Sequence, residues 1–222
     1  MRPSRSRAAA AAVAAWAAVG CAGSKPVPRA AVRPAPASDA AIPEGRELAA
    51  GLFGRDPLVG DDRLLRYVAL VGRTCGGRSV DGWRFAVTQS AVPYATAFPG
   101  GIVVVSRGLL LLVRSEAELA VVLSREIHRG ETAPAREFPG PAPESGDPAR
   151  ETALDAAGAR LASAAGYDAA AFLHLLDMLQ DRAASAREKS EIQERAGAYR
   201  ALPETSAGGR MLAERFRSSA IV

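Results

Sequence analysis

The residues of this chain that could do chemistry gather at Arg125-Glu126-Ile127-His128-Arg129. Glu126 offers a carboxylate of the kind that acts as a general base. Arg125 and Arg129 are four residues apart, so on a helix they share one face, which is the spacing at which two imidazoles can hold a metal ion. A guanidinium stays protonated in proteins and has no lone pair to donate, so neither arginine can be a metal ligand. The segment therefore combines a candidate general base with the spacing of two metal ligands, but arginines, which cannot bind a metal ion, stand at both ligand positions.

Neither of the two histidines is placed to replace these arginines. At about 100° per helical residue, His128 lies roughly 60° from Arg125 on the side away from Arg129, and roughly 160° from Glu126. It should point away from the centre of the site. His174 lies in the apolar repeat of a later predicted helix, which favours a core or boundary position over a metal-binding role.

The element that carries the segment is predicted to be a central helix. Ser115-Glu116-Ala117-Glu118 has the pattern of a capping box that opens a helix. Residues 119–127 are apolar on most sides, so this helix, which we expect to end near residue 129, should be buried. A shorter apolar helix is predicted over residues 108–113.

Three short strands are expected before this helix. Trp83, Phe85 and Val87 alternate with more polar residues, which predicts a half-buried strand over residues 83–88. Residues 94–98 can form a second strand, a turn at Pro99-Gly100-Gly101 follows, and residues 102–106 form a third. We expect a small antiparallel sheet in a mainly helical domain, which is an α+β fold.

Further helices follow from apolar periodicity and caps. They are predicted at residues 44–53, 61–73, 151–165, 169–182 and 211–216. Asp61 or Asp62 is the expected N-terminal cap of the second of these helices. The charge-rich residues 182–200 predict a solvated helix. Residues 130–148 are rich in proline, glycine and charge, so they predict a surface loop.

The N-terminus has the pattern of a secretory signal. Arginines at positions 2, 5 and 7 precede an apolar run over residues 8–19, and Ala18-Val19-Gly20-Cys21 resembles a bacterial lipobox, in which Cys21 would be lipidated. An ordinary signal peptide with a chance cysteine is the alternative. We divide the chain into a signal peptide (1–20), a Pro/Ala-rich tether (21–43) and one domain (44–222). This organisation indicates that the domain lies on the periplasmic face of the bacterial envelope. By analogy with related lipoproteins, Ala22 after Cys21, in place of an aspartate, favours anchoring in the outer membrane.

Charge argues against nucleic-acid binding. Loss of residues 1–20 removes three of 28 basic residues and leaves 25, against 24 acidic ones. The mature chain is nearly neutral, so it lacks the excess of lysine and arginine that binding to nucleic-acid phosphates needs. Cys75 would be the only remaining thiol, and we expect it to be buried.

Further motifs appear in order on both sides of residue 125. Those before it are Ala97-Phe98-Pro99-Gly100-Gly101, Ser106-Arg107-Gly108-Leu109-Leu110 and Ser115-Glu116-Ala117-Glu118-Leu119-Ala120-Val121-Val122-Leu123; those after it are Glu151-x-x-x-Asp155 and Ala165-Gly166-Tyr167-Asp168. This series resembles the HtpX-like and CAAX-prenyl-protease-like zinc metallopeptidases, peptidase family M48, especially their small periplasmic lipoprotein members. The resemblance covers about residues 44–217 and implies a gluzincin-type metallopeptidase domain.

The resemblance also implies roles for five positions. In the family, two histidines one helical turn apart and a glutamate of the following helix bind zinc, and the glutamate beside the first histidine activates the metal-bound water. Carried across, Arg125 and Arg129 stand at the lost ligand positions, Glu126 at the base position, Glu151 at the third-ligand position and Asp155 at the supporting position.

Two further positions depart from the family pattern. Ala95 stands near a usual asparagine on the substrate-facing edge strand, and Ala201 stands where a histidine often precedes the late proline.

Charge suggests what replaces the metal. Zinc held by two neutral imidazoles contributes two positive charges, and so do Arg125 and Arg129. We expect one of these guanidinium groups to occupy the metal position and pair bidentately with Glu151, and the other to pair with Glu126 or Asp155. The alternative is that Arg125, Glu126 and Arg129 form a solvated, charged helix end.

These observations predict an envelope lipoprotein that has lost hydrolysis, needs no cofactor and binds or regulates envelope proteins or unfolded peptides. Strand addition would place a peptide in a groove beside Tyr94, Ala95, Thr96, Ala97 and Phe98. One alternative is an active metalloendopeptidase in envelope protein quality control, with zinc at an altered site. Another is a structural lipoprotein without a functional groove. A nucleophilic Cys75 paired with a histidine has no local signature.

Overall fold

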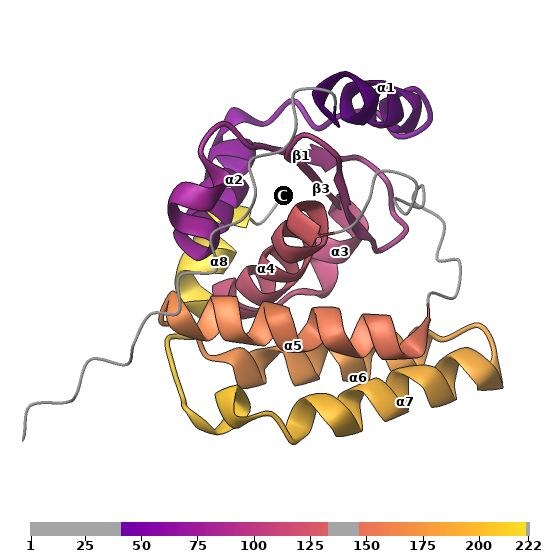
Figure 1. Ribbon diagram of the computed structural model, residues 1–222, viewed down its shortest axis with the longest axis vertical. Helices are drawn as coiled ribbons and strands as arrows, with labels where there is room; N and C mark the ends of the chain where they lie inside the picture. The colour runs from indigo at the N-terminus through magenta and orange to yellow at the C-terminus, as the bar shows by residue number, and fades with distance from the viewer. Residues whose placement is uncertain (1–40, 133–146, 221–222) are drawn as a thin grey trace, which may run out of the picture. The chain divides into compact units, whose positions relative to one another are not determined.

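In the computed structural model, which describes residues 41–132 and 147–220, helices cover both faces of one small sheet (Figure 1). The described residues all lie in one unit of the chain, residues 32–222. The predicted signal peptide, Cys21, nearly all of the tether and most of the predicted 130–148 loop lie outside the described residues. The α+β class is confirmed, because the described chain is mainly helical with a three-stranded sheet.

The elements follow one another closely along the chain. In order they are α1 (Ala41–Phe53), α2 (Asp62–Gly76), β1 (Arg84–Thr88), β2 (Ala95–Phe98), β3 (Ile102–Ser106), α3 (Arg107–Leu112), α4 (Glu116–Thr132), α5 (Pro148–Ala164), α6 (Phe172–Arg182), α7 (Ala186–Arg200) and α8 (Ala213–Ala220), with short 3-10 turns at Gly77–Val80, Ala169–Ala171 and Pro203–Ser206. Helix α1 begins three residues before the predicted start. None of these described helices is long and apolar enough to cross a membrane.

The caps that the sequence predicted are formed. The carboxylate of Asp61 accepts hydrogen bonds from the N–H groups of Arg63 and Leu64 at the start of α2. The hydroxyl of Ser115 accepts a hydrogen bond from the N–H of Glu118, which is one of the two bonds of a capping box, and the carboxylate of Glu118 accepts from the N–H of Arg114.

The sheet is mixed rather than fully antiparallel. Its order is β1-β3-β2, with β2 antiparallel and β1 parallel to β3. The turn through Gly100 and Gly101, both at positive φ, places β2 on one edge of β3. Strand β1 then pairs with the free edge of β3, and because the chain reverses direction twice between them, β1 and β3 run in parallel. The prediction of antiparallel pairing was therefore wrong for β1.

The two faces of the sheet pack against different helices. Val87, Ala97 and Val103 contribute to the main core, which also contains the buried side chains of α2 and α4. Phe98 and Val104 point to the opposite face and pack with Ala49 and Leu52 of α1. Helix α4 is buried along most of its length, with α5, α6 and α7 beyond it in Figure 1.

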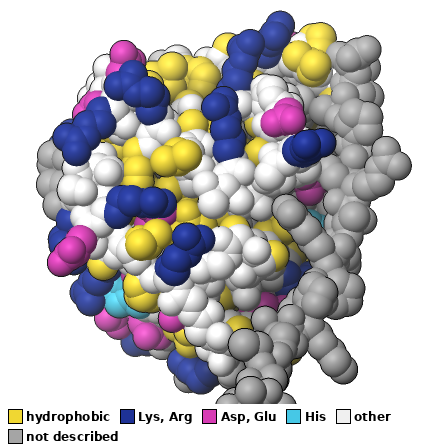
Figure 2. Space-filling view, turned by 90° about the vertical axis from the view of Figure 1, so that its left-hand side faces the viewer, with side chains coloured by type: hydrophobic (Ala, Val, Ile, Leu, Met, Phe, Trp, Pro, Cys, Tyr) yellow, Lys and Arg dark blue, Asp and Glu magenta, His cyan; other side chains and the backbone are white. Residues whose placement is uncertain are grey.

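One face of the surface is seen in Figure 2, on the side where α2 lies in Figure 1. Hydrophobic side chains appear there in small groups, interspersed with lysine and arginine side chains. Leu70 of α2, which is exposed, is one of the larger hydrophobic residues at the surface.

Candidate functional site

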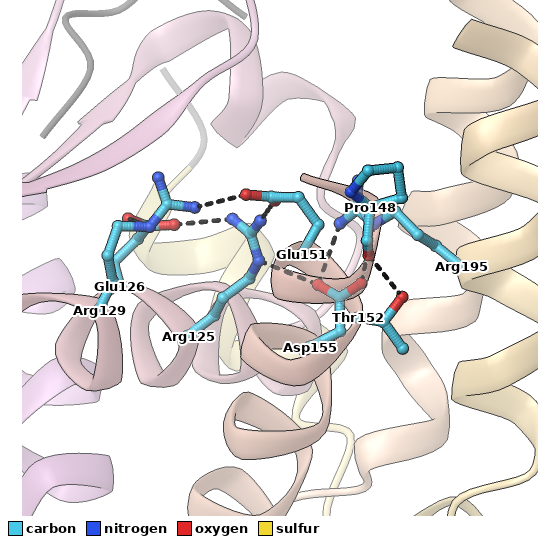
Figure 3. Close-up of polar contacts among 8 residues, drawn as sticks. All are labelled: Arg125, Glu126, Arg129, Pro148, Glu151, Thr152, Asp155 and Arg195. Carbon is cyan, nitrogen blue, oxygen red and sulfur yellow. Dashed lines mark hydrogen bonds and ion pairs between the residues drawn. The ribbon is translucent and has the colours of Figure 1, made fainter. Parts of the chain in front are cut away.

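Helices α4, α5 and α7 bring six charged side chains together (Figure 3). Helix α4 supplies Arg125, Glu126 and Arg129, α5 supplies Glu151 and Asp155, and α7 supplies Arg195. Glu151 and Asp155 are four residues apart, so both point from one face of α5 toward α4.

A glycine allows α4 and α5 to approach closely. A side-chain carbon added at Gly158 of α5 would lie 3.0 Å from the carbonyl oxygen of Val121 and 3.1 Å from Cβ of Arg125. The missing side chain therefore lets α5 bring its carboxylates within reach of Arg125.

The guanidinium of Arg125 lies at the centre of the cluster and contacts three carboxylates. Its Nε donates to Oδ1 of Asp155 at 2.9 Å, and its Nη1 donates to Oε1 of Glu126 at 2.8 Å. Its Nη2 donates to Oε2 of Glu151. One permanently charged group thus joins the base position, the third-ligand position and the supporting position that the resemblance assigned.

Arg129 completes the contacts of Glu126 and Glu151. Its Nη2 lies 3.5 Å from Oε1 of Glu151, and its Nε lies 3.4 Å from Oε2 of Glu126. Glu151 is thus shared between two arginines, one at each oxygen, whereas we had expected a single guanidinium to bind it through two hydrogen bonds.

Arg195 is the member that sequence reasoning missed. Its Nε donates to Oδ2 of Asp155 at 2.9 Å and its Nη2 donates to Oδ1 at 3.0 Å. The prediction of a wholly solvated helix at residues 182–200 was wrong on this face, because Ile192, Ala196 and Tyr199 are buried. Their spacing is the signal that could have placed Arg195 inside.

The cluster is largely buried, and each of its three carboxylates has a guanidinium partner. Glu126 is 0% exposed, Asp155 1% and Arg129 9%, so the alternative of a solvated helix end is wrong. Burial lowers the pKa of Arg129, and nearby Arg125, Arg150 and Arg195 lower it further, while Glu126 opposes this change.

These residues do not fit a zinc centre as the chain stands. Within residues 41–132 and 147–220, no group of three or more His, Cys, Asp and Glu side chains is arranged to hold a metal ion. The decisive observation is the donor set: guanidinium groups stand at the positions that imidazoles would need, and the nearby carboxylate oxygens already bind those groups.

The two histidines remain outside this cluster. His128 is half-buried, and burial together with Arg160 lowers the pKa of its imidazole. The described contacts include no hydrogen bond or ion pair between its ring and the three carboxylates. Nδ1 of His174 lies 3.1 Å from Oε2 of Glu118, at the boundary of the core, as predicted.

Cys75 is buried in the main core, as the sequence predicted. Burial raises the pKa of its thiol to about 12. A thiol of this kind is protonated and inaccessible, which argues against the nucleophilic alternative.

The residues of the predicted peptide groove lie at and beside an edge strand. The side chains of Thr96, Ala97 and Phe98 are buried, while Tyr94 and Ala95 are half-buried. Strand β2 packs against α4 near Gly130, where an added side-chain carbon would lie 3.4 Å from Cβ of Ala97. Hydroxyl contacts hold Tyr94 to Thr88 (2.6 Å) and Asp56 (3.0 Å), and burial raises the pKa of Tyr94 to about 12.

In the part of the chain that the structure describes, β2 is an edge strand, and one side of its backbone has no strand partner; this side is called the open edge. The carbonyl of Tyr94 accepts a hydrogen bond from the N–H of Ser106, and antiparallel pairing alternates bonded and non-bonded positions. The N–H and C=O groups of Ala95 and Ala97 therefore point away from β3. Among the described residues these groups face no strand, while most of the side chains of residues 94–98 lie in the core.

A second buried carboxylate, Glu116, lies at the opposite end of α4. Tyr167 donates its hydroxyl hydrogen to Oε1 of Glu116 at 2.7 Å, Tyr67 donates to Oε2 at 2.9 Å, and Arg215 of α8 binds both oxygens. Burial alone would raise the pKa of Glu116, but the hydrogen bonds from Arg215, Tyr167 and Tyr67 hold it below its usual value. In the sequence, Glu116 was recognised only as part of the capping pattern. Its contacts with Tyr67, Tyr167 and Arg215 were not predicted.

Comparison with known proteins adds one finding. Residues 65–128 match the family model for peptidase family M48. The match runs from α2 into α4 and includes Arg125 and Glu126. The other four members of the cluster lie after the matched segment: Arg129, Glu151, Asp155 and Arg195. A search of the curated proteins found no match.

Proposed function

We propose, from the match of residues 65–128 to peptidase family M48, that this metallopeptidase-like chain binds polypeptides without hydrolysing them. It would act as an envelope lipoprotein that holds or regulates unfolded peptides or envelope proteins. The alternative is an active metalloendopeptidase that uses an altered zinc site.

The contacts of Arg125 carry this proposal. A general base in metal-assisted hydrolysis must take a proton from a metal-bound water. Here one oxygen of Glu126 accepts a hydrogen bond from Arg125, and the other lies beside Arg129. The carboxylate at the base position therefore faces fixed cations, and the residues around it supply no imidazole that could hold a metal.

The open edge of β2 supports the binding part of the proposal. An extended peptide can add to a sheet edge through main-chain hydrogen bonds, which depend little on side-chain identity. Ala95 and Ala97 present these groups beside α4, on the strand that the family resemblance marked as substrate-facing. Loose sequence selectivity would suit unfolded clients.

The envelope location rests on the sequence of residues 1–22. Lipidation at Cys21 would anchor the domain to a membrane, with the outer membrane favoured. Expression in a bacterial host with a radiolabelled fatty acid tests this proposal. Label that disappears in Cys21→Ser is expected, and label retained in that variant would contradict lipidation at Cys21.

A digestion assay separates the proposal from the enzyme alternative. Purified protein is incubated with unfolded casein, with and without a chelator, and its zinc content is measured. We expect no chelator-sensitive cleavage and no stoichiometric zinc. Cleavage that chelator stops and Glu126→Gln abolishes would establish the peptidase alternative.

A strand variant tests the binding mode. Ala95→Pro removes an N–H that points to the open edge and leaves the ladder to β3 intact, so it should weaken binding of an unfolded peptide. Ala95→Ser keeps the N–H and serves as the matched control. Equal binding by both variants, with circular dichroism like that of the parent, would exclude strand addition at β2. No binding by the parent would favour the structural lipoprotein.

A further inference from the structure

A pocket away from the arginine cluster lies beside the other edge of the sheet. Its walls come from α1, α2, β1, the first residue of β3 and the loop between α1 and α2, and its cavity volume is about 350 Å³. This volume is at the lower end of the range for small-molecule sites. Because β1 and β2 are opposite edge strands, the pocket and the β2 edge are separate surfaces.

The walls of the pocket are largely apolar. Ala50 and Phe53 line it from one face of α1, Leu65 from α2 and Phe85 from β1. Burying a hydrocarbon chain against such walls is favourable by roughly 25 cal/mol for each Å² of apolar surface removed from water. The walls alone would therefore accept an apolar ligand.

The charged residues of the pocket are both arginines. Arg46 of α1 and Arg84 of β1 are exposed residues of its lining. Among the described residues, neither guanidinium has an acidic partner, in contrast to the arginines of the α4–α5 cluster. Unpaired guanidinium groups beside an apolar cavity suit a ligand that has a hydrocarbon part and an anionic head.

We propose that this pocket binds a small amphiphile with an apolar chain and a carboxylate, of the medium-chain fatty-acid type. The chain lies against Phe53, Leu65 and Phe85, and the carboxylate binds Arg46 and Arg84 at the rim. This binding does not depend on the peptide-binding proposal, because the two surfaces use different strands.

Titration of purified full-length protein with monomeric decanoate, followed by calorimetry, tests this inference. Saturable one-to-one binding is expected, and decanol should bind about tenfold more weakly because it lacks the charge-assisted hydrogen bonds. The Arg46→Gln/Arg84→Gln variant should bind decanoate about tenfold more weakly than the parent protein and should bind decanol as the parent does. Arg66→Gln, at an exposed arginine outside the pocket lining, is the matched control.

A second variant tests the location of the hydrocarbon chain. Ala50 is exposed and lines the pocket, so Ala50→Trp should fill the cavity without disturbing the core and abolish binding of both probes. Absence of saturable decanoate binding would overturn the proposal, as would binding that neither the arginine variant nor Ala50→Trp alters. Binding only to anionic phospholipid vesicles, with none to monomeric decanoate, would instead assign these arginines to a membrane surface.

Discussion

At the scale of residues, the distinguishing feature is a guanidinium surrounded by carboxylates. Buried carboxylates left without a partner are costly, and Glu126 and Asp155 are almost wholly buried. Arg125 meets this requirement for Glu126, Glu151 and Asp155, because its guanidinium donors lie fixed in one plane and reach all three carboxylates. The cation at this position thus holds the helices together.

Removal of this cation should destabilise the fold. Arg125→Met keeps much of the side-chain volume but leaves Glu126 and Glu151 with only the longer contacts of Arg129. We expect a loss of about 3 kcal/mol in the free energy of unfolding, measured by urea denaturation. Arg66→Met, in an exposed pair with Asp62, should change it by less than about 0.5 kcal/mol. Similar small losses in both variants would contradict a structural role for Arg125.

Restoring both imidazoles should restore metal binding. Arg125→His combined with Arg129→His supplies two neutral donors four residues apart on α4, opposite Glu151. We expect about one zinc per chain by elemental analysis and a melting temperature that rises with added zinc. Adding Glu151→Ala should weaken both effects. A double variant that folds but takes up no zinc would show that the remaining geometry no longer suits the metal.

At the scale of elements, the spacing of α4 and α5 controls the cluster. Gly158→Val would push the new side chain against the carbonyl of Val121 and against Arg125. We expect a loss of about 2 kcal/mol in unfolding free energy, since overpacking exceeds the gain in helix propensity. Gly197→Ala, at an uncrowded position of α7, should instead stabilise the protein by about 0.5 kcal/mol. A stable Gly158→Val variant would mean that α5 can move away from α4 at little cost.

The contact of α8 with α4 should depend on pH. Because the pKa of Glu116 is lower in the folded protein than in the unfolded chain, its contribution to stability is complete above the unfolded pKa of about 4.3 and is lost as pH falls through the folded value. Glu116→Gln cannot ionise, so the difference in melting temperature between parent and variant should be constant above about pH 5 and should shrink as the pH falls below about 4.3. A difference that does not shrink below this pH would show that ionised Glu116 contributes nothing.

Much of this architecture could be predicted from local sequence signals. Apolar periodicity and the Asp61 and Ser115 caps placed the helices, because these signals act within one or two turns. Parallel pairing of β1 with β3 and the contact between Arg215 and Glu116 depend on residues distant in sequence, so no local pattern contained them. Arg195 was missed because abundant charge around it concealed the apolar face of α7.

At the scale of the whole molecule, stability should not depend on a divalent metal. In the cluster that α4, α5 and α7 form, each of the three carboxylates already has a guanidinium partner, so removing free metal ions leaves none of them without a cation. We expect the melting temperature of the purified parent protein to be the same within about 1 °C with and without a strong chelator, since nothing that binds the native state is removed. The zinc-loaded Arg125→His/Arg129→His variant should lose stability under the same treatment and thereby confirm that the chelator is effective. A chelator-dependent decrease in the parent would show that its fold retains a metal ion, and the arginines could then no longer be considered its replacement.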